Sequence, residues 1–176
     1  MPLHFNTLES RSLSSGLAQR TLKNLDFIKN AGDAEDVHLV TQVVNSLLSL
    51  LVFPVEKERE FFKGFESIAF KNPSDLEGTK AQLIEHLPVP SVQITSFARC
   101  RNLSQFFKKV RNAISHKHLE LSGVPDTRML GEVTITLKDR RQGDPPSAFD
   151  WEVSLTAKDL EELSRFVAHK IIDARL

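Results

Sequence analysis

The sequence predicts a mainly α-helical domain, a bundle of four to five helices with a β-hairpin inserted before the last helix. Up to about residue 118, apolar residues recur three and four positions apart, which is typical of amphipathic helices. Between residues 132 and 155 the period falls to two in two short runs, which is typical of paired strands. A chain of 176 residues suits a single domain, 1–176, with one sizeable core.

Two helices are expected in the N-terminal third of the chain. Asn6 can cap the first helix, and Gly32 should end it. Asp33 with Asp36 can open the second helix, which should stop at Pro54 because proline lacks a backbone N–H. The second half of this helix is apolar nearly all round, so it is expected at the centre of the core.

The middle of the chain predicts shorter elements. A third helix is expected over about 56–70, and another could begin at Ser74. Pro88 and Pro90 should then force an extended piece. A fourth helix is expected over about 97–118, with its apolar side made by Leu103, Phe106, Val110, Ala113 and Ile114.

A hairpin and a final helix should complete the domain. The expected strands carry alternating apolar residues, namely Val133, Ile135 and Leu137 in one and Phe149, Trp151, Val153 and Leu155 in the other. Gly143 lies between them, which suits a long tip. Thr156, followed three residues later by Asp159, then forms a capping box for the last helix.

The composition excludes several classes of protein. Lys plus Arg equals Asp plus Glu at 23 each, so a nucleic-acid site would have to be a local basic patch. The single Cys100 rules out an internal disulfide and fits a reducing compartment. Neither a signal peptide nor a membrane span is predicted, and we expect a cytoplasmic protein with no membrane partner.

One string of six residues carries chemistry. Arg111, Asn112 and His116 place a permanent cation, an amide and a group that titrates near neutral pH close together in sequence. This trio suits work on a phosphodiester, because the guanidinium can hold a phosphate, the imidazole can move a proton and the amide can orient one of them. The alternative is that the string belongs to the solvated face of an ordinary amphipathic helix.

The neighbours of the string make this helix face basic, as a phosphate-binding patch would be. These neighbours are Arg101, Lys108, Lys109 and Lys117. Arg111 and His116 would lie roughly 140° apart on a straight helix, so they converge only if the helix loosens near His116 or if a partner copy completes the site. A metal site at His116 and His118 is not expected, since no Cys or nearby carboxylate pair completes a ligand set.

A second polar stripe runs along the second helix. Gln42 and Asn45 lie on it, and amides on an otherwise apolar helix need partners if they are buried. Satisfied polar packing between helices is the simpler interpretation. The functional interpretation is that Gln42 or Asn45 lines the same cleft as Arg111.

The string RNAISH near the end of a helix, inside a bundle of four or five helices, resembles the HEPN superfamily. The wider layout is similar to a plasmid- and defence-associated bacterial branch of that superfamily. The resemblance covers most of the chain. It implies a metal-independent endoribonuclease that needs no cofactor and acts as a homodimer in toxin–antitoxin, abortive-infection or anti-phage systems.

The resemblance also implies roles for individual residues. Arg111 would clamp the phosphate, His116 would act as general base or acid, and Asn112 would hold the histidine or the scissile group. Lys108, Ser115 and Lys117, with Gln42 and Asn45, are then expected to bind RNA or line the cleft. An antitoxin or a nucleotidyltransferase is a possible partner. Two alternatives remain open: an inactive HEPN-like scaffold subunit and a nucleotide-binding sensor.

Overall fold

The computed structural model describes residues 7–30, 38–57, 59–123, 129–141, 143–145 and 148–174 of the chain. Within these residues the helices are α1 (Thr7–Asn30), α2 (Leu39–Lys57), α3 (Arg59–Glu66), α4 (Leu76–His86), α5 (Leu103–Ser115) and α6 (Ala157–Asp173). The strands are β1 (Gln93–Phe97), β2 (Leu119–Ser122), β3 (Thr134–Asp139) and β4 (Trp151–Thr156), and a 3₁₀ turn, η1 (Leu130–Glu132), precedes β3. The prediction of a mainly helical fold is confirmed.

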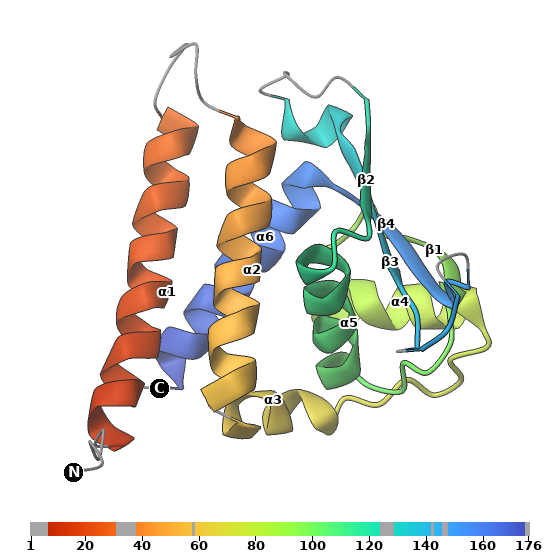
Figure 1. The fold of residues 1–176 in the computed structure, drawn as a ribbon, viewed down its shortest axis with the longest axis horizontal. Helices are drawn as coiled ribbons and strands as arrows, with labels where there is room; N and C mark the ends of the chain where they lie inside the picture. Colours follow the sequence, from red (N-terminus) through yellow and green to blue (C-terminus); the bar gives the residue numbers. More distant parts are fainter. Residues whose placement is uncertain are drawn as a thin grey trace.

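The molecule has a helical side and a sheet side (Figure 1). Helices α1 and α2 run antiparallel beside one another, and α6 packs against both. Helix α5 stands between α2 and the sheet and contacts both α2 and β3. Helix α5 therefore joins the two sides, as does α6, which also contacts β4. No helix in the described residues is long and apolar enough to cross a membrane.

The prediction that Pro54 ends the second helix is wrong, because α2 continues to Lys57. A proline inside a helix removes one backbone hydrogen bond and costs about 3 kcal/mol. The buried side of α2, formed by Val43, Leu47, Leu50 and Leu51, packs against α1, α5 and α6. That tertiary packing outweighs the local cost.

The expected ends of other helices also need correction. The caps predicted at Asn6, Gly32, Asp33 and Asp36 lie outside the described residues. Helix α3 ends at Glu66, earlier than expected. Helix α4 is capped by Asp75 rather than by Ser74, since the Asp75 carboxylate accepts a hydrogen bond of 3.1 Å from the Gly78 N–H. Helix α5 spans Leu103–Ser115, shorter than the expected 97–118, with Asn102 as its N-cap.

The predicted hairpin is the centre of a larger sheet. Strands β3 and β4 pair antiparallel, with Ile135 opposite Leu155. The sheet has four antiparallel strands in the order β1-β4-β3-β2, so the expectation of a hairpin alone is wrong. The last helix begins as predicted, with the Thr156 and Asp159 side chains forming a capping box.

The core is one cluster that extends from α1, α2 and α6 through α5 to the sheet. Trp151, Phe106 and Phe107 are among its largest fully buried side chains. The rings of Phe106 and Trp151 meet edge to face with centroids 5.9 Å apart, a geometry that adds to the burial of their area.

An ion pair is buried beside this aromatic cluster. The Lys109 Nζ lies 3.1 Å from an Asp139 Oδ, and both side chains are about nine-tenths buried. Lys109 comes from the inner side of α5, and Asp139 continues the buried alternation of β3 at its last residue. The ammonium also lies 5.8 Å from the Trp151 ring centroid. The pair therefore ties α5 to one end of the sheet.

We expect Lys109→Ala to destabilise the fold by about 3–5 kcal/mol, because the Asp139 carboxylate would be left buried without its partner. Urea unfolding measures this loss. The double substitution Lys109→Met with Asp139→Leu should recover most of it, since no charge is then buried. If Lys109→Ala alone were as stable as the wild type, Lys109 and Asp139 would not form a buried ion pair.

Candidate functional site

Apart from Gln42 and Asn45, the predicted site residues lie on the outer face of α5 and on the turn that ends it. The apolar side of α5 is buried as expected, including Leu103, Phe106, Val110, Ala113 and Ile114. Arg111 and Asn112 are half-buried at the edge of this face, while Lys108, Ser115, His116 and Lys117 are exposed. The expectation for Lys109 is wrong: it is buried with Asp139 and does not belong to the exposed basic face.

Arg111 and Asn112 form a linked pair. The Arg111 Nη2 donates a hydrogen bond of 2.7 Å to the Asn112 Oδ1. The Arg111 Nε is buried and has no hydrogen-bond partner among the described residues. The Asn112 amide thus fixes the Nη2 of the guanidinium, while the Nε remains a hydrogen-bond donor without an acceptor among the described residues.

Helix α5 ends at the motif. His116 is the C-cap, and Lys117 adopts a left-handed conformation with φ 58°. The N–H of His118 donates to the Ala113 carbonyl at 2.8 Å, and the N–H of Lys117 donates to the Ile114 carbonyl at 3.1 Å. These two bonds form a Schellman motif. The N–H of His116 still donates to the Asn112 carbonyl at 2.9 Å, so the chain leaves the helical course only after His116. The turn therefore does not by itself bring His116 toward Arg111.

The same turn brings a second histidine beside the first. The rings of His116 and His118 have centroids 5.9 Å apart. His118 also meets the ring of Phe149 edge to face at 5.1 Å, and its Nδ1 is buried without a partner among the described residues. From the sequence alone, His118 suggests only a metal ligand. Its place beside His116 depends on the left-handed turn, which spacing does not reveal.

A basic pocket of about 240 Å³ adjoins the motif on the side of the α5 N-terminus. It is lined by Arg99, Gln105, Lys108, Lys109, Asn112, Asp139, Arg140 and Arg141. Lys108 and Asn112 were predicted site residues. Arg99, Arg140 and Arg141 were not, because they come from the segments after β1 and β3, and only the sheet topology brings these segments to α5.

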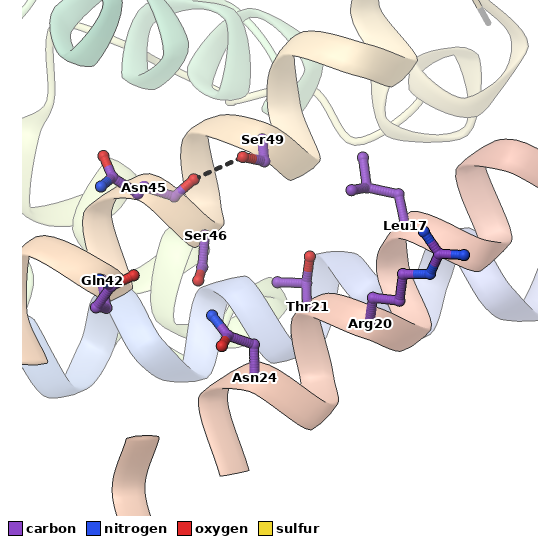
Figure 2. A pocket seen from close by; sticks show the side chains of 8 residues that line it. All are labelled: Leu17, Arg20, Thr21, Asn24, Gln42, Asn45, Ser46 and Ser49. Atoms are coloured by element: carbon purple, nitrogen blue, oxygen red, sulfur yellow. Dashed lines mark hydrogen bonds between the residues drawn. The ribbon is translucent and has the colours of Figure 1, made fainter. Parts of the chain in front are cut away.

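Gln42 and Asn45 lie elsewhere. They line a groove of about 330 Å³ between α1 and α2, together with Arg20 and Asn24. Figure 2 shows Thr21 and Asn24 on α1 facing Ser46 on α2 across this groove. Arg111 is not among the lining residues, so a single protomer does not bring Gln42 or Asn45 into its cleft.

Two other chemistries can be assessed from the geometry. Burial raises the pKa of the Cys100 thiol to about 12, so this side chain stays protonated at neutral pH and is a poor nucleophile. In the described part of the chain, no three His, Cys, Asp or Glu side chains gather as a metal site would require.

Comparison with known protein families gives a match over nearly the whole chain. A family model described as HEPN pEK499 p136 matches residues 6–175, nearly the whole chain. Neither the curated proteins nor the solved structures contain a significant match.

Lys117 provides a test of the turn at the motif. A left-handed conformation costs a residue with a Cβ about 1–2 kcal/mol, and glycine avoids that cost. Lys117→Gly should therefore raise the free energy of unfolding by up to about 1 kcal/mol, whereas the β-branched Lys117→Val should lower it. Denaturant unfolding of both variants decides the matter, and a destabilised glycine variant would argue against the turn.

Proposed function

Because the chain belongs to the HEPN pEK499 p136 family, which confirms its resemblance to the HEPN superfamily, we propose that it is a metal-independent endoribonuclease. The observation that supports this most is the arrangement at the end of α5. There a hydrogen-bonded Arg111–Asn112 pair lies one turn before two neighbouring histidines. These groups can bind a phosphate and transfer protons without a metal ion.

RNA carries its own nucleophile, the 2′-hydroxyl. In the proposed reaction the 2′-oxygen attacks the adjacent phosphorus and the bond from phosphorus to the 5′-oxygen breaks. The products are a 2′,3′-cyclic phosphate and a 5′-hydroxyl end. One imidazole takes the proton of the 2′-hydroxyl, and a proton is delivered to the departing 5′-oxygen.

The residues divide these tasks by their chemistry. Arg111 holds the phosphate and stabilises its added negative charge. Asn112 fixes the guanidinium through the bond that links the two side chains. His116 is exposed and serves as base or acid. In this proposal the neighbouring His118, whose ring centroid is 5.9 Å away, takes the complementary role.

The proposed active form is a homodimer with the C-terminal half of α5 at its interface. The support is geometric: in one protomer the motif lies on an outer helix face, where no second element of the described chain covers His116. A partner copy would enclose the site and exclude water. We place the enzyme in the cytoplasm, in a toxin–antitoxin, abortive-infection or anti-phage system, with an antitoxin or a nucleotidyltransferase as a possible partner.

Arg111→Ala and His116→Ala should each lower the rate of RNA cleavage by about a hundredfold or more, since each removes a group that acts on the transition state. Asn112→Ala should have a smaller effect, because it positions the guanidinium. Denaturing gels of total RNA and tRNA incubated in EDTA measure the rates, and circular dichroism checks the fold. Cleavage by both variants at the wild-type rate would remove the assignment.

His118→Ala should slow cleavage strongly and remove one limb of the pH–rate profile, because a second proton carrier would be lost. His118→Phe is the matched control for packing on Phe149, since it keeps an aromatic ring. If His118→Phe were as active as the wild type, the role of His118 would be structural.

Cleavage should persist in EDTA and fall as salt rises, because cationic groups hold the RNA. Activity that disappears in EDTA and returns with Mg²⁺ or Mn²⁺ would contradict the mechanism.

Sedimentation should show a dimer, and a monomer at micromolar concentration that still cleaves would contradict the composite site. RNA binding without any cleavage would favour the scaffold or sensor alternatives.

A further inference from the structure

The basic pocket beside the motif has charges that its own carboxylates do not neutralise. Five of its lining residues are cations, but Lys109 is paired with Asp139 and Arg99 is paired with Asp150. Lys108, Arg140 and Arg141 have no carboxylate partner in the described part of the chain. The pocket is therefore suited to an anion.

Arg140 is the best-defined of these three cations. Its guanidinium lies 5.8 Å from the centroid of the Phe149 ring, which fixes the side chain by a cation–π contact. Its Nη1 is nonetheless buried without a hydrogen-bond partner among the described residues. A buried guanidinium N–H normally has an acceptor, and none of the described residues supplies one to this atom.

The neighbouring Lys138 shows the contrast. It lies above the same ring at 6.0 Å, but its ammonium is bonded to Glu120 at 2.8 Å and also approaches Glu152. The hydrogen bond with Glu120 raises the pKa of Lys138. The protein thus supplies a carboxylate to one cation above Phe149 and none to the other.

Two sets of side-chain contacts connect the pocket with the motif. Asn112 lines the pocket and accepts the hydrogen bond from Arg111. Phe149 contacts His118 on the motif side and Arg140 on the pocket side. An anion in the pocket would therefore be a near neighbour of the phosphate at Arg111.

We propose that this pocket, built from Lys108, Arg140 and Arg141, holds the RNA phosphodiester next to the one that is cleaved. The inference rests on the proposed ribonuclease function. A volume of about 240 Å³ is below the range of about 300–1,000 Å³ usual for drug-sized ligands, so it fits a phosphate group better than a whole nucleotide. The guanidinium forks of two arginines match the oxygens of a phosphodiester.

Binding of single-stranded RNA by the full chain carrying His116→Ala, followed by fluorescence anisotropy over a range of salt, tests the proposal. Arg140→Ala and Arg141→Ala, each added to this inactive background, should weaken binding several-fold and reduce the salt slope by about one. Lys23→Ala, an exposed cation on α1, is the control for net charge and should change neither. If Arg140→Ala and Arg141→Ala had the same affinity and salt slope as the Lys23→Ala control, the proposal that the pocket binds a phosphate would be wrong.

A modified substrate locates the contact. RNA with a 2′-deoxy residue at the cleaved position and one uncharged methylphosphonate next to it should bind the wild type several-fold more weakly. The same substitution should cost the Arg140→Ala variant little, because the contact is already absent. The methylphosphonate is placed in turn on each side of the cleaved bond. If it weakened RNA binding equally in the wild type and in Arg140→Ala at both positions, the pocket would not hold the neighbouring phosphodiester.

The outcome separates this inference from the proposed function. If the wild type never cleaves RNA but loses affinity with Arg140→Ala, the pocket stands as a phosphate site and the nuclease proposal fails. If the wild type cleaves RNA and the pocket variants bind and cleave normally, the nuclease proposal stands and the pocket fails. Thermal melting confirms that each variant is folded.

Discussion

The buried ion pair between Lys109 and Asp139 fixes one point at which the motif helix meets the sheet. It joins the inner side of α5 to the last residue of β3, beside the fully buried Trp151. Two charges removed from water stabilise a fold only when they meet in good geometry, so this contact admits few alternative placements of α5. The positions of Asn112 on the helix and Arg140 just beyond β3 follow from it, and with them the pocket that both residues line.

The other constraint is the left-handed turn at Lys117. It stops α5 after Ser115 and directs the chain through His118, whose carbonyl accepts a bond from the Lys138 N–H, into β2. A helix that continued for another turn would carry His118 about 200° away from His116 on its surface. The Schellman motif instead places the two rings close together. The strain of a non-glycine residue at positive φ thus lies next to the catalytic groups proposed here, as is common at functional sites.

Local patterns were enough to predict the elements that depend on nearest neighbours in sequence. The β3–β4 hairpin, the Thr156–Asp159 capping box and the buried side of α5 follow from alternation, cap spacing and helical period. The sequence does not predict the outer strands, because β1 and β2 are short and have mixed burial, and they become strands by pairing with β4 and β3. Lys109 was misassigned because its partner lies 30 residues away, and a lysine with a distant carboxylate cannot be told from a solvated one by sequence.

Net charge does not predict the basic pocket, for a related reason. The chain has equal numbers of acidic and basic residues, which argues against a nucleic-acid surface if charge is spread evenly. It is not spread evenly, because Asp139, Asp150 and Glu120 are each bonded to a cation near the site. These carboxylates neutralise Lys109, Arg99 and Lys138. In the described residues, Lys108, Arg140 and Arg141 are left without acidic partners. A neutral protein can therefore present a local cationic surface, and the field that attracts a polyanion depends on pairing geometry rather than on composition.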